Sequence, residues 1–272
     1  MARAEAQLAA TLCGNERGCL APTVQKRESI MIASIKRHLH QKYLRFTKRT
    51  YGFNWMNDID QLTESKWTPR VIFDVGANVG QTAAELCRHW RAAHVHSFEP
   101  VTSTYEVLCA NTRHIGRVQC HNLALGDENK SVTINAVPFS DRNSLVAQYD
   151  DAMNPGVPTE INVTTLDSIT AGLGLSAVDV LKTDTEGYDL QVLRGASRLL
   201  RSGGIQWVYS EVTFLPKSTQ QASFPALNAF LNEHGLECVG IYDGEGLWPR
   251  RWGSYCNALF STRELVSHWR KR

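Results

Sequence analysis

The chain has 272 residues, of which 43% are hydrophobic and 21% charged, and this length fits one large globular domain or one domain with an appendage. The net charge of +2 hides an uneven distribution. Residues 1–50 carry ten Lys/Arg and three Asp/Glu, a net of +7, whereas residues 51–272 carry 19 and 24, a net of −5. No run approaches the roughly 18 apolar residues of a membrane-spanning helix, and residues 1–19 lack the apolar core of a secretory signal. The seven cysteines form no C-x-x-C pair, which favours free thiols and a cytoplasmic location.

Residues 30–48 predict a basic amphipathic helix. Its apolar positions recur at steps of three and four: Ile32, Ile35, Leu39, Tyr43 and Phe46. Two interpretations stay open, because such a helix either packs its stripe on the body or lies on an anionic membrane surface through residues 30–49. We expect residues 1–69 to form a basic helical extension that serves as a lid, a dimer contact or a docking helix. Residues 70–272 then form the main domain.

From residue 70 onward, short apolar strands alternate with helical stretches. Strands are predicted at 71–75, 94–98, 118–123, 161–163, 178–182 and 205–210, with a β-like stretch at 132–134. Helices are predicted at 81–91, 102–112, 188–200 and 224–233, and a final antiparallel pair at 236–241 and 255–260. The alternation is typical of a doubly wound α/β sheet. In such sheets ligands bind at the carboxyl ends of the strands.

Acidic residues stand at four of these carboxyl ends, namely Asp74, Glu99, Asp184 and Glu211. Collecting carboxylates on one edge is costly unless they serve a ligand, a cation or hydrogen-bond donors. The first strand also runs into a glycine-containing turn, Gly76 to Gly80, that opens a helix, as in nucleotide-cofactor loops. Glu99 follows Gly76 by 23 residues, where a carboxylate accepts both hydroxyls of an adenosine ribose.

The turn favours S-adenosylmethionine over NAD. A dinucleotide needs a second glycine near its pyrophosphate, and Asn78 stands at that position while Asp74 would repel a phosphate. S-adenosylmethionine has no phosphate, and its sulfonium and ammonium suit an acidic turn. An NAD-dependent oxidoreductase stays the alternative enzyme, and a nucleic-acid or membrane-binding protein that uses the basic arm is the non-enzymatic alternative. Nucleic acid is not the expected partner, because the predicted site edge is acidic.

Several segments resemble the FkbM-type S-adenosylmethionine-dependent methyltransferase family. They are VIFDVGANVGQTA (71–83), VHSFEP (95–100), NLALGD (122–127), VTTLDS (163–168), VLKTDTEGYDLQVLRGA (180–196) and YCNALF (255–260). The resemblance runs from about residue 70 to 261 and leaves residues 1–69 outside. It implies a class I methyltransferase (Rossmann-like) sheet of seven strands with an antiparallel last strand pair. It also implies O-methylation of a hydroxyl on a sugar, a glycoconjugate or a polyketide-like natural product.

The resemblance also implies which residues bind the cofactor: Asp74, Gly76, Asn78, Gly80, Glu99, Asn122, Ala124 and Leu125. Catalysis needs a base, because a neutral alcohol is a poor nucleophile. The candidates are Asp184, Glu186 and Glu211, with Asp184 favoured. As an alternative, Asp184 and Glu211 hold Mg²⁺, which would acidify the acceptor hydroxyl.

A Pro/Asn/Asp-rich loop at 138–159 is too long for a bare connection between strands. We interpret it as the element that recognises the acceptor. Within it, Arg142, Asn143 and Ser144 are the predicted acceptor contacts, together with Tyr188 just after the acidic motif.

Overall fold

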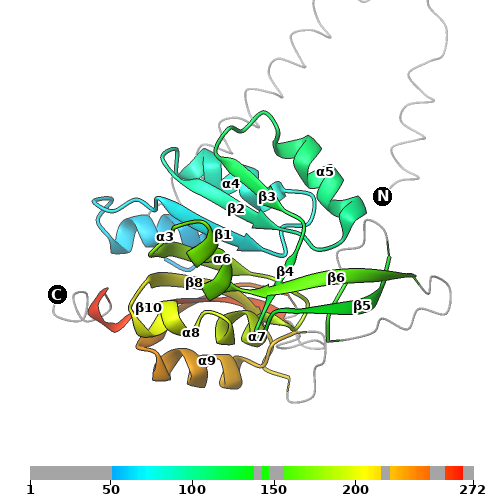
Figure 1. Ribbon diagram of the computed structural model, residues 1–272. Helices are drawn as coiled ribbons and strands as arrows, with labels where there is room; N and C mark the ends of the chain where they lie inside the picture. Colours follow the sequence, from blue (N-terminus) through cyan, green and yellow to red (C-terminus); the bar gives the residue numbers. More distant parts are fainter. Residues whose placement is uncertain (1–50, 138–142, 147–155, 216–220, 246–254, 266–272) are drawn as a thin grey trace, which may run out of the picture. The chain divides into compact units, whose positions relative to one another are not determined.

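The computed structural model describes residues 51–137, 143–146, 156–215, 221–245 and 255–265 (Figure 1). A compact unit runs from Thr50 to Arg272. The predicted helix at 30–48 and the candidate Arg142 lie outside the described residues. Within those ranges, every helix is too short or too polar to cross a membrane.

The main sheet has the seven strands expected for a class I methyltransferase. In chain order they are β1 (Val71–Val75), β2 (His94–Phe98), β3 (Val118–His121), β7 (Val178–Thr183), β8 (Ile205–Val212), β9 (Leu236–Glu245) and β10 (Tyr255–Thr262). The order across the sheet is β3-β2-β1-β7-β8-β10-β9. The strands from β3 to β8 pair in parallel, whereas β10 runs antiparallel to both β8 and β9. The predicted fold is therefore confirmed.

Helices cover both faces of this sheet because side chains of a strand alternate between faces. The helices that follow β1 in the chain are α4 (Gln81–His89), α5 (Thr102–Thr112), α6 (Leu166–Gly172), α7 (Asp189–Arg194), α8 (Ser197–Arg201) and α9 (Phe224–Glu233). One core holds Phe73 and Val75 with the apolar residues of α7, α8 and α9. The other holds Ile72 with those of α4. Alternate residues of β1 therefore serve opposite layers.

A further helix, α3 (Trp55–Leu62), joins the second of these cores. Trp55 stacks on Tyr209 of β8 with ring centroids 4.3 Å apart, and Ile59 is fully buried. The Asp58 carboxylate accepts a hydrogen bond of 2.7 Å from the Tyr242 hydroxyl of β9. The sequence prediction placed this segment in the N-terminal extension, whereas its aromatic and apolar side chains complete a face of the sheet.

A separate three-stranded sheet was not predicted. It consists of β4 (Ala124–Gly126), β5 (Lys130–Ala136) and β6 (Val157–Thr165), in the order β4-β6-β5 (Figure 1). β4 is parallel to β6, and β5 is antiparallel to it. The predicted third strand ends at His121, so that Ala124 and Leu125 belong to this second sheet. The predicted helix 188–200 is also divided, because α7 ends before Gly195, whose α-carbon lies against the backbone of Gly126.

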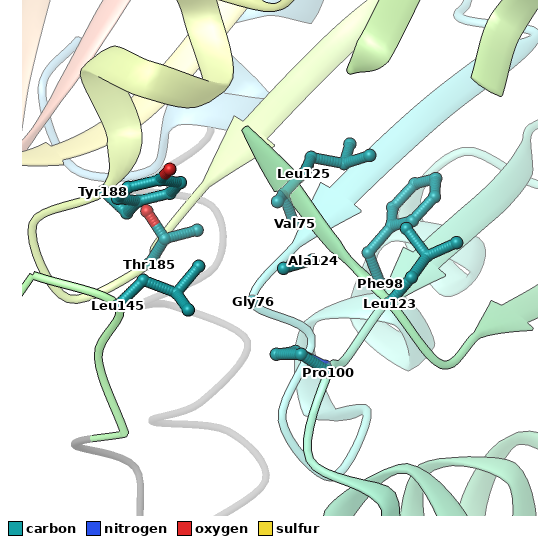
Figure 2. Close-up of a pocket in the computed structure, with 10 residues that line it drawn as sticks. All are labelled: Val75, Gly76, Phe98, Pro100, Leu123, Ala124, Leu125, Leu145, Thr185 and Tyr188. Carbon is teal, nitrogen blue, oxygen red and sulfur yellow. The ribbon is translucent and has the colours of Figure 1, made fainter. Parts of the chain in front are cut away.

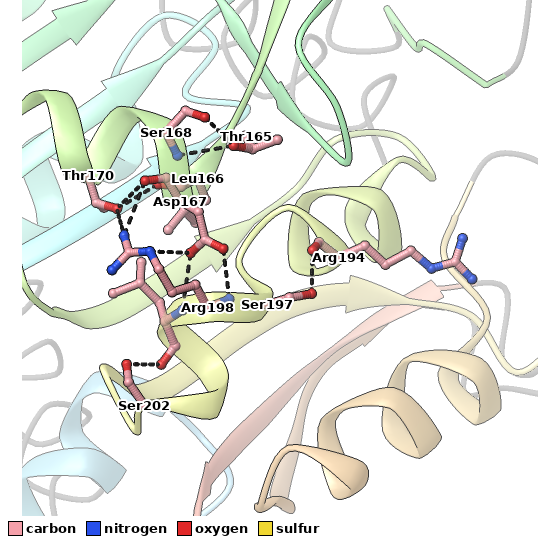
Figure 3. Close-up of polar contacts among 10 residues, drawn as sticks. Thr165, Leu166, Asp167, Ser168, Thr170, Arg194, Ser197, Arg198 and Ser202 are labelled. Atoms are coloured by element: carbon pink, nitrogen blue, oxygen red, sulfur yellow. Dashed lines mark hydrogen bonds and ion pairs between the residues drawn. The ribbon is translucent and has the colours of Figure 1, made fainter.

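Asp167, in the first turn of α6 just after β6, ties this helix to α8 (Figure 3). Its carboxylate accepts hydrogen bonds from the backbone amides of Arg198 (2.7 Å) and Leu199 (3.1 Å). These amides open α8 and have no partner inside the helix. The Asp of the VTTLDS segment is therefore a structural cap for a helix that follows it by some 30 residues.

We expect Asp167→Ala to lower the free energy of unfolding by about 1–2 kcal/mol, the usual cost of removing a helix cap. Urea denaturation followed by circular dichroism measures the change. Glu128→Ala is the matched control, because its ion pair with Lys130 is exposed and contributes little. Equal stabilities of the two variants would contradict the capping role.

Candidate active site

The turn after β1 is held between the ends of β2 and β7. The amides of Gly76 and Ala77 donate to the Phe98 carbonyl at 3.1 and 3.0 Å, and the Asp184 amide donates to the Val75 carbonyl at 3.0 Å. Gly76 has φ of 76°, and a Cβ there would lie 1.9 Å from the Asp184 carbonyl oxygen. Only glycine fits this position, so the turn is shaped by the close approach of β7.

Glu99 lies directly beside this turn and is almost fully buried, with 8% of its surface exposed. Its Oε2 accepts a hydrogen bond from the Asn78 amide (3.1 Å), and its Oε1 accepts one from the Val101 amide (2.9 Å). Asn78 adopts φ of 47°, which turns its amide toward Glu99. Burial raises the pKa of Glu99 to about 7. A carboxylate offers about four acceptor positions, so two stay available for donors of a ligand.

An apolar pocket opens at the carboxyl ends of β1, β2 and β7 (Figure 2). Phe98, Leu123 and Pro100 form one wall, and Thr185, Tyr188 and Leu145 form the opposite wall. Between the walls lie Val75, Gly76, Ala124 and Leu125. The pocket thus contains three of the predicted cofactor residues, namely Gly76, Ala124 and Leu125.

Asn122, another predicted cofactor residue, has its side-chain groups engaged with the protein. Its Nδ2 donates to the carbonyl oxygens of Glu99 and Pro100, both at 3.0 Å. Its Oδ1 accepts a bond of 3.1 Å from the Thr102 hydroxyl. The structure therefore places Asn122 where it fixes the backbone that carries Glu99.

Asp74, which does not line the pocket, forms a buried ion pair. The Lys182 Nζ lies 3.2 Å from Asp74 Oδ1 and 3.4 Å from Asp184 Oδ2, and it donates to the Gly76 carbonyl at 3.2 Å. Asp74 is fully buried and Lys182 is 5% exposed. Burial lowers the pKa of Lys182, but the carboxylates of Asp74 and Asp184 outweigh this effect and raise it, so the lysine is charged. Asp74 therefore stabilises the turn through Lys182.

Lys182 was missed by the sequence prediction, which treated 178–182 as an ordinary buried strand. The available signal was a lysine inside an apolar run two residues before Asp184. A buried lysine requires anionic partners. The partners here are the predicted acidic residues themselves.

Asp184, Glu186 and Glu211 come together as predicted. Each offers a carboxylate oxygen within 4.8 Å of those of the other two. Glu211 Oε2 is buried and has no hydrogen-bond partner among the described residues. Burial and the nearby charges of Asp184, Glu186 and Asp189 raise the pKa of Glu211 to about 9. Glu211 therefore holds a proton at neutral pH when no ligand is bound.

Asp189, at the start of α7, is a second residue that the prediction missed. It is fully buried, and burial raises its pKa to about 6. It adds negative potential behind Glu211. The sequence does not single out Asp189, because acidic residues are common in the first turn of a helix.

The predicted acceptor contacts have different surroundings. The Ser144 hydroxyl donates to the Glu186 carbonyl at 2.6 Å, beside the acidic cluster. The Asn143 side chain instead binds the backbone of Val137, accepting from its amide (2.8 Å) and donating to its carbonyl (2.9 Å). Tyr188 lines the pocket, and its hydroxyl donates to Asp127 at 3.3 Å. The structure brings Ser144 and Tyr188 to the site, while Asn143 fixes its own loop.

Comparison with known proteins decides the family. The model of the methyltransferase FkbM domain matches residues 74–238, more than half of the chain. The chain belongs to the FkbM methyltransferase family. This membership implies S-adenosylmethionine-dependent methyl transfer, and it disfavours the oxidoreductase alternative.

Among the relatives of this FkbM methyltransferase are two curated proteins. Methyltransferase 1 of Beauveria bassiana is 25% identical over 142 residues, which is 46% of this chain and 57% of that protein. The hexuronic acid methyltransferase AglP of Haloferax volcanii is 27% identical over 133 residues, 48% of this chain and 52% of that protein. The chain thus spans little more than half the length of these relatives.

The solved structures that are similar to this chain include a methyltransferase FkbM from Methylobacillus flagellatus KT. It superimposes on this chain with a TM-score of 0.47 and 18% sequence identity, over 71% of this chain and 43% of that one.

Proposed function

We propose that this chain is an S-adenosylmethionine-dependent O-methyltransferase that acts on a hydroxyl of a sugar, a glycoconjugate or a polyketide-like natural product. One observation carries the proposal: a buried Glu211 oxygen, which has no hydrogen-bond partner in the described part of the chain, lies in a cluster of three carboxylates next to the apolar pocket. The loop after β7 contributes residues to both the pocket and the carboxylate cluster. Its Thr185 and Tyr188 line the pocket, and its Asp184 and Glu186 belong to the cluster.

The residues at the pocket fit S-adenosylmethionine. Apolar side chains of the pocket suit a flat adenine ring, and the free acceptor positions of Glu99 suit the two ribose hydroxyls. When bound, the cofactor supplies a methyl group that its sulfonium already activates. The protein's remaining task is to align the acceptor oxygen and to remove its proton.

Glu211 is better suited than Asp184 to take this proton. Lys182 Nζ lies 3.4 Å from Asp184 Oδ2, so this carboxylate is already engaged with a cation of the protein. Glu211 has no such counter-charge within hydrogen-bond distance among the described residues, and its raised pKa makes it a strong base once ionised. Glu211 Oε2 then accepts the hydroxyl proton, while Asp184 and Glu186 position the acceptor.

The same three carboxylates offer a second use. Their oxygens are close enough to bind one divalent cation, and Mg²⁺ prefers such oxygen ligands. In that case the cation would acidify the hydroxyl and Glu211 would be a ligand. A chelator separates the two uses, because EDTA leaves base catalysis intact and abolishes metal-assisted transfer.

A panel of acceptors tests the proposal. The purified chain would be given labelled S-adenosylmethionine with a neutral methyl glycoside, a hexuronic acid, an amino sugar or a polyol macrolide, and products would be read by mass spectrometry. We expect methylation of a hydroxyl oxygen in at least one member. Methylation confined to amine nitrogen or to a carboxylate would contradict O-methyltransferase activity.

A further inference from the structure

We infer that residues 143–146, here called the cap segment, form part of the cofactor site, with Leu145 as a cofactor-binding residue and Ser144 as a positioning residue for Glu186. This inference rests on the proposed function. The sequence predicts that this loop binds the acceptor, whereas the ligand inferred here for the cap segment is the cofactor.

Leu145 lies on the wall of the pocket that also contains Thr185 and Tyr188 (Figure 2). The other lining residues come from the ends of the main strands or from β4, whereas Leu145 comes from the connection between β5 and β6. It packs against the core of the main sheet and also against that of the small sheet. Its neighbour Val146 is 47% exposed, so the segment directs one apolar side chain inward and the next outward.

Ser144 holds the acidic loop. Its hydroxyl donates to the Glu186 carbonyl at 2.6 Å and accepts from the Val146 amide at 3.0 Å, so both partners fix its position. Glu186 has φ of 51°, a left-handed conformation that a non-glycine residue keeps only when its surroundings impose it. A hydrogen bond to its carbonyl fixes the orientation of that peptide, and hence the direction in which the Glu186 carboxylate points.

Asn143 anchors the beginning of the segment. Its amide side chain pairs with both backbone groups of Val137, six residues earlier, which closes a short loop after β5. The cap segment is thereby connected to the small sheet at one end and to the acidic loop at Ser144. A ligand in the pocket therefore meets Leu145, while the Glu186 peptide is held by the residue next to it.

The two side chains predict different kinetic effects. Leu145→Ala removes one apolar side chain from a wall of the pocket, so the dissociation constant of S-adenosylhomocysteine should rise about tenfold, the usual range for a few lost apolar groups. Ser144→Ala leaves the wall intact and frees the Glu186 peptide. The kcat for methyl transfer should then fall, with the cofactor KM within twofold of the wild-type value, and Ser144→Thr should restore most of the kcat.

Titration calorimetry with S-adenosylhomocysteine, followed by transfer assays at saturating cofactor, tests the inference. Val157→Ala is the matched control, because it shortens an exposed valine of β6 that does not line the pocket, and it should change neither quantity. Wild-type affinity in Leu145→Ala would overturn the binding role, and unchanged kcat in Ser144→Ala would overturn the positioning role. Absence of binding by the wild-type chain would overturn the proposed function, and this inference with it.

Discussion

Glu211→Gln is expected to abolish methyl transfer and, at the same time, to make the ligand-free chain more stable at neutral and alkaline pH. The pKa of Glu211 is raised from 4.5 to about 9 in the folded chain, so folding takes up a proton that the unfolded chain has released. The free energy of unfolding is therefore unaffected by this group below about pH 4.5 and falls as the pH rises toward 9. Glutamine has no such dependence.

Urea denaturation at pH 5 and pH 8 measures this effect. The variant should lie within about 1 kcal/mol of the wild type at pH 5 and should gain about 4 kcal/mol over it between pH 5 and pH 8, since each pH unit in this window corresponds to about 1.4 kcal/mol. Glu128→Gln is the control, because that side chain is exposed and should alter neither stability nor transfer. Parallel pH curves for wild type and Glu211→Gln, or retained transfer, would show that Glu211 does not have the role assigned to it. The expected trade of stability for activity is common at active sites.

Lys182→Met should destabilise the fold by about 3–5 kcal/mol, the cost of leaving a buried charge without its partner. Asp74 is fully buried, and Lys182 Nζ is its cationic neighbour at 3.2 Å. The lysine also donates to the Gly76 carbonyl, so its loss should loosen the turn that the cofactor would contact.

A double variant separates the buried charge from simple loss of packing. Asp74→Asn combined with Lys182→Met removes both charges, and it should recover much of the stability that Lys182→Met loses. Thermal unfolding of the wild type, both single variants and the double variant forms a complete cycle. An additive double variant would mean that the two side chains do not depend on each other.

The main sheet could be predicted because each strand is a short apolar run that ends at a distinctive residue. Asp74, Glu99 and Glu211 mark such ends, and parallel strands bring their carboxyl ends to one edge. The same rule predicted the cluster of Asp184, Glu186 and Glu211. Local pattern was sufficient here, since each strand carries its own signal.

Features that depend on distant residues could not be predicted. The ion pair of Lys182 joins positions 108 residues apart, and neither residue alone shows that the other is near. The three residues of β4 are too few to show a periodic pattern. They form a strand because they pair with β6, about 39 residues later. The packing of α3 on the sheet could not be predicted either, because its partners Tyr209 and Tyr242 lie on strands far along the chain.

We propose that Glu99 and the neighbouring pocket bind the adenosyl part of S-adenosylmethionine. Titration calorimetry of the wild-type chain with S-adenosylhomocysteine, and of Glu99→Ala beside the exposed control Glu106→Ala, tests it most directly. We predict saturable heat for the wild type and for Glu106→Ala, with affinity that increases as the pH rises through 7 and Glu99 ionises, and no measurable binding for Glu99→Ala. Binding heat with NAD but none with S-adenosylhomocysteine would contradict this cofactor assignment. Unchanged affinity in Glu99→Ala would contradict the role of Glu99.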